Sequence, residues 1–155
     1  MKNKIHKYDF LIIGAGLIGS IAALALVKKK FRVLVIDKKF ELPNDDRTLA
    51  VNANSIDFLK QLGIWNKLKS QPQPIDKIII EDNINEKPII FENDDESMGN
   101  VILNQEMSKV ARQKLVNLKI LKIKTNIDMN KIFPEKTILI DNKNYIFKKV
   151  IISIG

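Results

Sequence analysis

The chain has no cysteine, and its one histidine is His6, close to the start. Without thiols there is no disulfide framework, no thiolate nucleophile and no cysteine-ligated zinc or iron–sulfur site. A single histidine also argues against a histidine metal cluster and against a Ser–His–Asp triad. The sequence therefore predicts no metal site and leaves the catalytic residues unknown, and any redox chemistry would come from a bound cofactor.

Arginine is scarce as well, since only three of the 26 basic residues are arginines and the formal net charge is +8. Nucleic-acid readers favour arginine, whose planar fork matches phosphates and guanine edges, so no nucleic-acid partner is predicted. Most of the excess charge lies in residues 101–155. A solvated lysine surface is the ordinary explanation, and attraction to an anionic membrane surface is the alternative.

The 155 residues, of which 45% are hydrophobic and 28% charged, have the composition of a soluble globular chain and the length of about one domain. The longest uncharged run, Phe10–Val27, is flanked by lysines, as a membrane anchor would be. It contains three glycines, however, and each costs a helix about 1 kcal/mol relative to alanine. A buried strand over 8–13, a glycine turn and a helix over 17–29 explain the run better.

The remaining segments alternate between short apolar runs and amphipathic stretches. Up to residue 68 the sequence predicts a strand over 32–36, a polar loop over 38–50, a helix over 55–62 with Asn54 as candidate N-cap and Gly63 as its stop, and a helical turn over 64–68. Strands over 76–81 and 87–91, joined by a turn at 83–86, are followed by an acidic loop over 92–100. The later elements are a helix over 105–117, a strand over 118–124 and a hairpin in which strands 137–140 and 145–147 are joined by a turn at 141–144. A last strand over 150–154 has no helix after it. It is either an edge strand or part of a larger architecture. Parallel strands are normally buried on both faces, and this favours the larger architecture.

The hexapeptide from Gly14 to Gly19 matches the pattern G-x-G-x-x-G between a predicted strand and a predicted helix. Gly14 permits a tight turn, Gly16 lets backbone amides approach a diphosphate at the positive end of the helix, and Gly19 permits close packing. Asp37, eighteen positions after Gly19, is expected to accept hydrogen bonds from ribose hydroxyls. The alternative is a glycine turn with no ligand.

The type of dinucleotide follows only in part from these residues. An acid at position 37 disfavours the 2′-phosphate of NADP, although Lys38 and Lys39 weaken that exclusion. The strand–helix–strand unit alone does not distinguish NAD from FAD.

Several segments resemble one family. The stretch Asp46–Ser55, followed by Leu59 and by Leu62-Gly63-Ile64-Trp65, resembles the flavoprotein aromatic hydroxylases of ubiquinone biosynthesis. These belong to the FAD-dependent monooxygenases similar to para-hydroxybenzoate hydroxylase. Residues 8–16, 101–104 and 148–155 also resemble segments of that family, but the likeness is strong only over 8–65. The chain ends before the family's Asp-Gly motif, so it resembles the amino-terminal portion.

The resemblance implies FAD as cofactor and assigns residues to it. Arg47 matches the arginine that reaches the phosphate or ribityl region, and its alternative role is a loop ion pair with Asp45 or Asp46. Asn104 matches a residue near the ribityl chain, and its alternative role is N-cap of the helix from Gln105. The predicted cofactor-binding residues are Gly14, Ala15, Gly16, Ile18, Gly19, Asp37, Lys38, Arg47 and Asn104.

The fold implied is α/β: a Rossmann-like FAD/NAD(P)-binding βαβ fold with part of a second, β-rich substrate domain. Residues 1–72 are assigned to the FAD-binding βαβ unit and the helices after it. Residues 73–100 are assigned to strands of the partial substrate domain, and 101–155 to a return to the FAD-binding domain, truncated at Gly155.

The activity implied is hydroxylation of a small-molecule or lipid-tailed phenolic substrate in ubiquinone biosynthesis. One alternative is a truncated, non-catalytic remnant of such a flavoprotein, and another is an NAD-dependent oxidoreductase. The resemblance further implies a cytoplasmic location with peripheral contact at the inner face of the membrane, and a complementary chain that carries the missing half.

Overall fold

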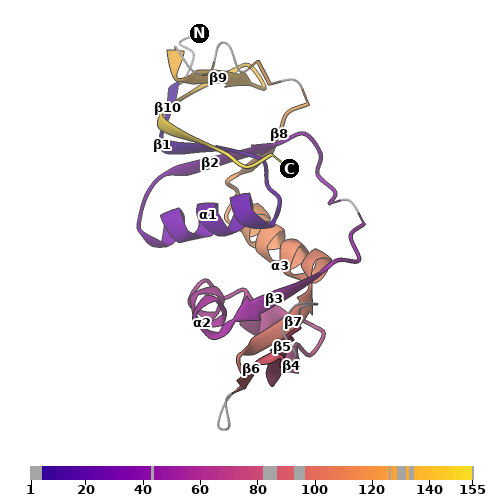
Figure 1. Ribbon diagram of the computed structural model, residues 1–155. Coiled ribbons are helices and arrows are strands. Elements are labelled where there is room, and N and C mark those ends of the chain that lie inside the picture. Colours follow the sequence, from indigo (N-terminus) through magenta and orange to yellow (C-terminus); the bar gives the residue numbers. More distant parts are fainter. Residues whose placement is uncertain are drawn as a thin grey trace. The chain divides into compact units, whose positions relative to one another are not determined.

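A computed structural model of the chain describes residues 5–42, 44–81, 87–92, 97–125, 127–128, 132 and 135–154 (Figure 1). The chain divides into two compact units. The first combines residues 1–44 with 108–155, and the second comprises residues 45–107. Each unit is described by itself.

The first unit is built on a five-stranded sheet in the order β8-β2-β1-β10-β9. Its strands are β1 (Ile5–Ile13), β2 (Val33–Asp37), β8 (Leu121–Ile123), β9 (Thr137–Ile140) and β10 (Lys143–Ile152). β1 pairs in parallel with both β2 and β10, β2 pairs in parallel with β8, and only β9 is antiparallel to its neighbour. The predicted α/β class with a parallel sheet is confirmed.

The core of this unit lies on the central strands. Leu11, Ile13, Leu34 and Ile36 pack with residues of β9 and β10 in one buried cluster. The intervening residues of β1 and β2 are just as buried on the opposite face, because the pleat alternates side chains between faces. This two-sided burial is typical of parallel strands and explains their continuous apolar runs.

The uncharged run 10–27 forms part of β1, a turn and most of α1 (Leu17–Lys28), as predicted. α1 packs against β1 and β2 (Figure 1). Of the helices that the structure describes, none has the length and apolar character needed to cross a membrane.

The predicted hairpin at the C-terminal side is confirmed, but its turn is shorter than 141–144. Asp141 and Asn142 both have positive φ, 49° and 56°, as a two-residue turn between antiparallel strands requires. The predicted strands 145–147 and 150–154 also join into one strand, β10, which ends at Ile152 rather than at residue 154. The two lysines between them do not interrupt it, because they are exposed and Lys148 pairs with Asp9 of β1 at 2.7 Å.

The second unit contains a three-stranded antiparallel sheet in the order β3-β7-β4. Its elements are β3 (Thr48–Asn52), α2 (Ala53–Gln61), a short helix η1 (Trp65–Lys67), β4 (Gln73–Ile75), β7 (Gly99–Leu103) and the start of α3 (Asn104–Asn117). The loops predicted over 38–50 and 92–100 are therefore wrong at Thr48–Ala50, at Glu92 and at Gly99–Asn100, and β4 was not predicted. β3 and β7 are short and stabilise each other by pairing across a long stretch of sequence, which leaves little local signal.

The predicted strands near 76–81 and 87–91 form the two-stranded ribbon of β5 (Lys77–Ile80) and β6 (Ile89–Glu92). The predicted turn at 83–86 lies outside the described residues. Ile79 pairs with Ile90 on one face, and Ile78 pairs with Phe91 on the other. All four side chains are exposed, so both faces of the ribbon present an apolar surface.

The N-cap of α2 is Asn52, not the predicted Asn54. The side chain of Asn52 accepts a hydrogen bond from the backbone amide of Ser55 at 2.8 Å. Asn52 is also the last residue of β3, so the end of the strand decides which asparagine caps the helix. The predicted stop is confirmed, since Gly63 follows the C-cap Leu62 with φ at +65°.

Replacing Asn52 with alanine is expected to lower the free energy of unfolding by about 1 kcal/mol, because one amide of the first helical turn loses its acceptor. Asn54→Ala is the matched control. Asn54 is exposed in the first turn, and its replacement should change stability by less than about 0.5 kcal/mol. Urea unfolding of both variants tests the assignment, and a larger loss for Asn54→Ala would contradict it.

Candidate functional site

The glycine loop joins the end of β1 to the start of α1, and two of its glycines are fixed by close contacts. Gly14 has φ at +102°, and a Cβ on it would lie 2.2 Å from the carbonyl oxygen of Ser153. A Cβ on Gly19 would lie 2.0 Å from the carbonyl oxygen of Gly14. The loop is therefore held against the segment after β10, where the Ser153 amide donates to the carbonyl of Ile13 at 2.8 Å.

Gly16 differs from the other two, because a Cβ on it would meet nothing within 4 Å. It is the N-cap of α1, has extended backbone angles and provides no side chain to cap the helix. The first amides of a helix have no partner within the helix, and they lie at the positive end of its dipole. Open space at the N-cap, beside these amides, is what an anionic group such as a diphosphate requires, so the loop fits one.

Asp37 ends β2 and turns its carboxylate toward the glycine loop. One oxygen, Oδ2, accepts hydrogen bonds from the amide of Ala15 at 2.7 Å and from Nη1 of Arg112 at 2.9 Å. The other oxygen, Oδ1, accepts from the amide of Lys38 at 2.6 Å. Partial burial alone would raise the pKa of Asp37, but the Ala15 amide and the Arg112 guanidinium outweigh it, so that the pKa lies below its usual value.

Arg112 of α3 belongs to this cluster, although no motif in the sequence predicts this position. Its side chain is buried, and Nη1 also donates to the carbonyl of Ala15 at 2.9 Å, while Nη2 donates to the carbonyl of Lys39. Nε has no hydrogen-bond partner among the described atoms. A signal was present in the sequence: Arg112 falls on the same helical stripe as the buried Ala111 and Leu115, where a charge is rare.

Arg47 and Asn104 come together in the second unit through Asp45. Nε and Nη2 of Arg47 lie 2.7 and 2.9 Å from the two carboxylate oxygens of Asp45, to which Nδ2 of Asn104 also donates. The amide of Asn104 donates to the carbonyl of Arg47 at 2.9 Å, beside the β3–β7 pairing. These hydrogen bonds hold the pKa of Asp45 far below its usual value. The structure thus describes the loop ion pair, and a cofactor role for both residues stays a prediction.

The side chains of two further predicted cofactor-binding residues, Ile18 and Lys38, have no described polar contact. Ile18 is 69% exposed on the first turn of α1, and the side chain of Lys38 is exposed after β2. Among the described residues, no group of three or more carboxylate and histidine side chains is placed to hold a metal ion.

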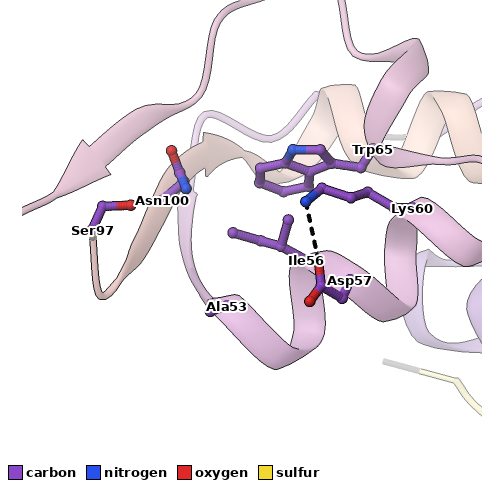
Figure 2. Close-up of a pocket in the computed structure, with 7 residues that line it drawn as sticks. All are labelled: Ala53, Ile56, Asp57, Lys60, Trp65, Ser97 and Asn100. Carbon is purple, nitrogen blue, oxygen red and sulfur yellow. Dashed lines mark hydrogen bonds and ion pairs between the residues drawn. The ribbon is translucent and has the colours of Figure 1, made fainter. Parts of the chain in front are cut away.

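A separate pocket of about 480 Å³ lies in the second unit between α2, η1 and the start of β7 (Figure 2). Lys60 crosses its rim and pairs with Asp57 at 3.0 Å, and the indole of Trp65 forms one wall. None of the predicted cofactor-binding residues lines this pocket.

Comparison with known proteins gives consistent results. The FAD binding domain family matches residues 7–135. The chain is 27% identical over 139 residues to the mitochondrial ubiquinone biosynthesis monooxygenase COQ6 of Caenorhabditis elegans, covering 80% of this chain and 31% of that protein. The chain therefore spans about a third of the length of this curated relative.

Solved structures show the same fold. The p-nitrophenol 4-monooxygenase PnpA from Pseudomonas putida DLL-E4 is similar with a TM-score of 0.66 at 15% identity, covering 97% of this chain and 42% of that one. The flavin-dependent monooxygenase PieE, in complex with FAD and substrate, is similar with a TM-score of 0.56 at 14% identity, covering 76% and 23%.

The strand–helix–strand unit alone does not distinguish NAD from FAD. The family match does, because the matched family is an FAD binding domain and the matched segment includes the glycine loop and Asp37. The open, uncapped start of α1 fits the diphosphate of a dinucleotide. The cofactor is therefore FAD, and the chain belongs to the FAD binding domain family.

Proposed function

We propose that the chain binds FAD through the loop 14–19 and Asp37, as the FAD-binding part of an aromatic-ring hydroxylase of ubiquinone biosynthesis. The observation that carries the proposal is the open space over Gly16 at the uncapped start of α1. When bound, the flavin supplies the redox chemistry of the ring hydroxylation. The role of the chain is to bind and orient it.

Each residue of the loop has a distinct part in this proposal. The amides from Gly16 to Ile18 donate to the diphosphate oxygens, and Asp37 accepts from the hydroxyls of the adenosine ribose. Ala15 and Gly19 shape the loop, and Lys38 follows the carboxylate in the chain. The assignment of Arg47 and Asn104 to FAD rests on the resemblance alone, and it requires the exposed guanidinium of Arg47 to exchange Asp45 for a phosphate.

The proposed substrate is a small-molecule or lipid-tailed phenolic compound. Similarity to the C. elegans monooxygenase and the resemblance over residues 46–65 support this class. We propose further that residues 73–100 form part of a substrate domain, and that residues 1–72 and 101–155 belong to the FAD-binding domain. The basic residues of 101–155 support peripheral contact with an anionic membrane surface from the cytoplasmic side. Because the chain spans 31% of the length of that relative, we propose that a complementary chain completes the substrate site.

Thermal unfolding of the purified chain with FAD, NAD or riboflavin tests the proposed cofactor. FAD at about a hundred times its Kd should stabilise the fold by about 2.7 kcal/mol and raise the midpoint by several degrees. Riboflavin lacks the diphosphate and should have little effect. Stabilisation by NAD but not by FAD would favour an NAD-dependent oxidoreductase, and stabilisation by neither would favour a non-catalytic remnant.

A further inference from the structure

The buried guanidinium of Arg112 has no part in the function proposed so far. It is 5% exposed, and it reaches three acceptors: the carbonyl of Ala15, Oδ2 of Asp37 and the carbonyl of Lys39. They belong to the glycine loop, to the last residue of β2 and to the chain just after β2, respectively. The guanidinium therefore connects α3 to the two segments that face a dinucleotide in this fold.

The peptide groups of Ala15 are held from both ends by this cluster. The amide of Ala15 donates to Asp37 at 2.7 Å, while its carbonyl accepts from Arg112 at 2.9 Å and from the hydroxyl of Ser20 at 3.0 Å. The backbone just before Gly16 is thus fixed by buried and partly buried groups. Fixed donors and acceptors of this kind pre-organise a site before its ligand arrives.

The two carboxylate oxygens of Asp37 have different surroundings. Oδ2 is occupied by the Ala15 amide and by Arg112. Oδ1 accepts from the Lys38 amide at 2.6 Å and has only a long contact, 3.4 Å, with the amide of Lys39. A carboxylate oxygen accepts about two hydrogen bonds, so Oδ1 keeps capacity for a further donor. The side chain also remains 22% exposed.

We infer that Arg112 is a positioning residue for the adenosine end of FAD: it holds Oδ2 of Asp37 so that Oδ1 is presented to the ribose hydroxyls. This inference rests on the proposed FAD binding. A purely stabilising role fits the cluster less well, because Nε is buried without a described partner and apolar residues often serve stability as well as a buried ion pair does.

The test compares binding of ADP with that of 2′,3′-dideoxy-ADP to the full chain, using calorimetry. The wild-type chain should prefer ADP by about tenfold, since hydrogen bonds from hydroxyls to a charged acceptor are lost in the dideoxy compound. In Arg112→Met the preference should fall to about twofold or less, because Asp37 is no longer oriented. A general loss of loop structure would weaken both ligands equally and leave the ratio unchanged.

Arg112→Lys provides a second variant that keeps the positive charge. One ammonium cannot reproduce both the contacts of Nη1 with Ala15 and Asp37 and the contact of Nη2 with Lys39. The preference of this variant for ADP should therefore lie between those of the wild type and Arg112→Met. Arg32→Met is the matched control. Arg32 is exposed and lies 5.6 Å from the ring centre of Tyr8, and its replacement should keep the wild-type preference.

The two possible failures are distinguishable. If neither ADP nor FAD binds the wild-type chain, the proposed function itself is wrong. If both bind and the wild-type chain shows no preference for ADP, or if Arg112→Met and Arg112→Lys keep the wild-type preference, the inference about Arg112 is overturned while FAD binding stands.

Discussion

Replacing Gly19 with alanine is expected to lower the free energy of unfolding by about 3 kcal/mol. The new methyl group would lie 2.0 Å from the carbonyl oxygen of Gly14 and 3.3 Å from Cβ of Ser153. Gly14 cannot move away, because its own Cα faces the carbonyl of Ser153 at a distance that excludes a side chain. The first turn of α1 would therefore have to separate from the loop and from the segment after β10.

Gly16→Ala is the matched control for this prediction. Gly16 has open space around it and a φ of −64°, which alanine adopts without strain. The cost should stay below about 1 kcal/mol, the usual difference between glycine and alanine at an N-cap. Urea unfolding of the two variants provides the comparison. Equal stability of Gly19→Ala and Gly16→Ala would show that the close contact at Gly19 is absent.

Replacing Asp37 with asparagine is expected to lower the free energy of unfolding by about 2 kcal/mol near pH 7. The variant leaves the buried guanidinium of Arg112 without its counter-charge. Breaking a fully buried pair costs about 3–5 kcal/mol, and the 22% exposure of Asp37 reduces that figure through solvent screening.

The pH dependence of this loss follows from the lowered pKa of Asp37. Because the folded-state pKa lies below the ordinary value of 3.8, the unfolded chain takes up the proton first as the pH falls. The contribution of Asp37 to the free energy of unfolding is therefore complete above the ordinary pKa of 3.8 and disappears as the pH drops through the lower pKa of the folded state. The difference between wild type and Asp37→Asn should shrink from about pH 4 downward.

Asp57→Asn controls for the general effect of removing a carboxylate. Asp57 pairs with Lys60 on the surface of α2, with 68% of its side chain exposed. Its replacement should change stability by less than about 0.5 kcal/mol at either pH. Urea unfolding of the wild type and both variants near pH 7 and near pH 3 measures these differences in stability. A loss for Asp37→Asn that stayed constant between them would contradict the linkage.

The sequence predicted the first unit well where the signal is local. The apolar runs of β1 and β2, the glycine loop and the acid at the end of β2 each depend on neighbouring residues, and all were located within a few positions. The hairpin of β9 and β10 was also found from its turn residues. Its true extent was missed because the exposed lysines in β10 are tolerated by a strand whose pairing with β1 continues past them.

The second unit was predicted less completely, because its sheet depends on pairing between distant segments. Nothing within Thr48–Asn52 shows that it pairs with Gly99–Leu103. The choice between Asn52 and Asn54 as N-cap depends on where β3 ends, which that same pairing decides. Arg112 was missed for a related reason: its partners lie 73 to 97 residues away in the sequence.

Titration of FAD into the purified chain, followed by calorimetry, tests most directly whether the amides at the start of α1 hold the diphosphate. The wild-type chain should bind one FAD in a saturable manner. Gly16→Val should keep the unfolding midpoint within a few degrees but bind FAD at least about tenfold more weakly, because the side chain fills the space that the phosphates need. Unchanged affinity in the folded Gly16→Val variant, or no binding by the wild-type chain, would contradict the account.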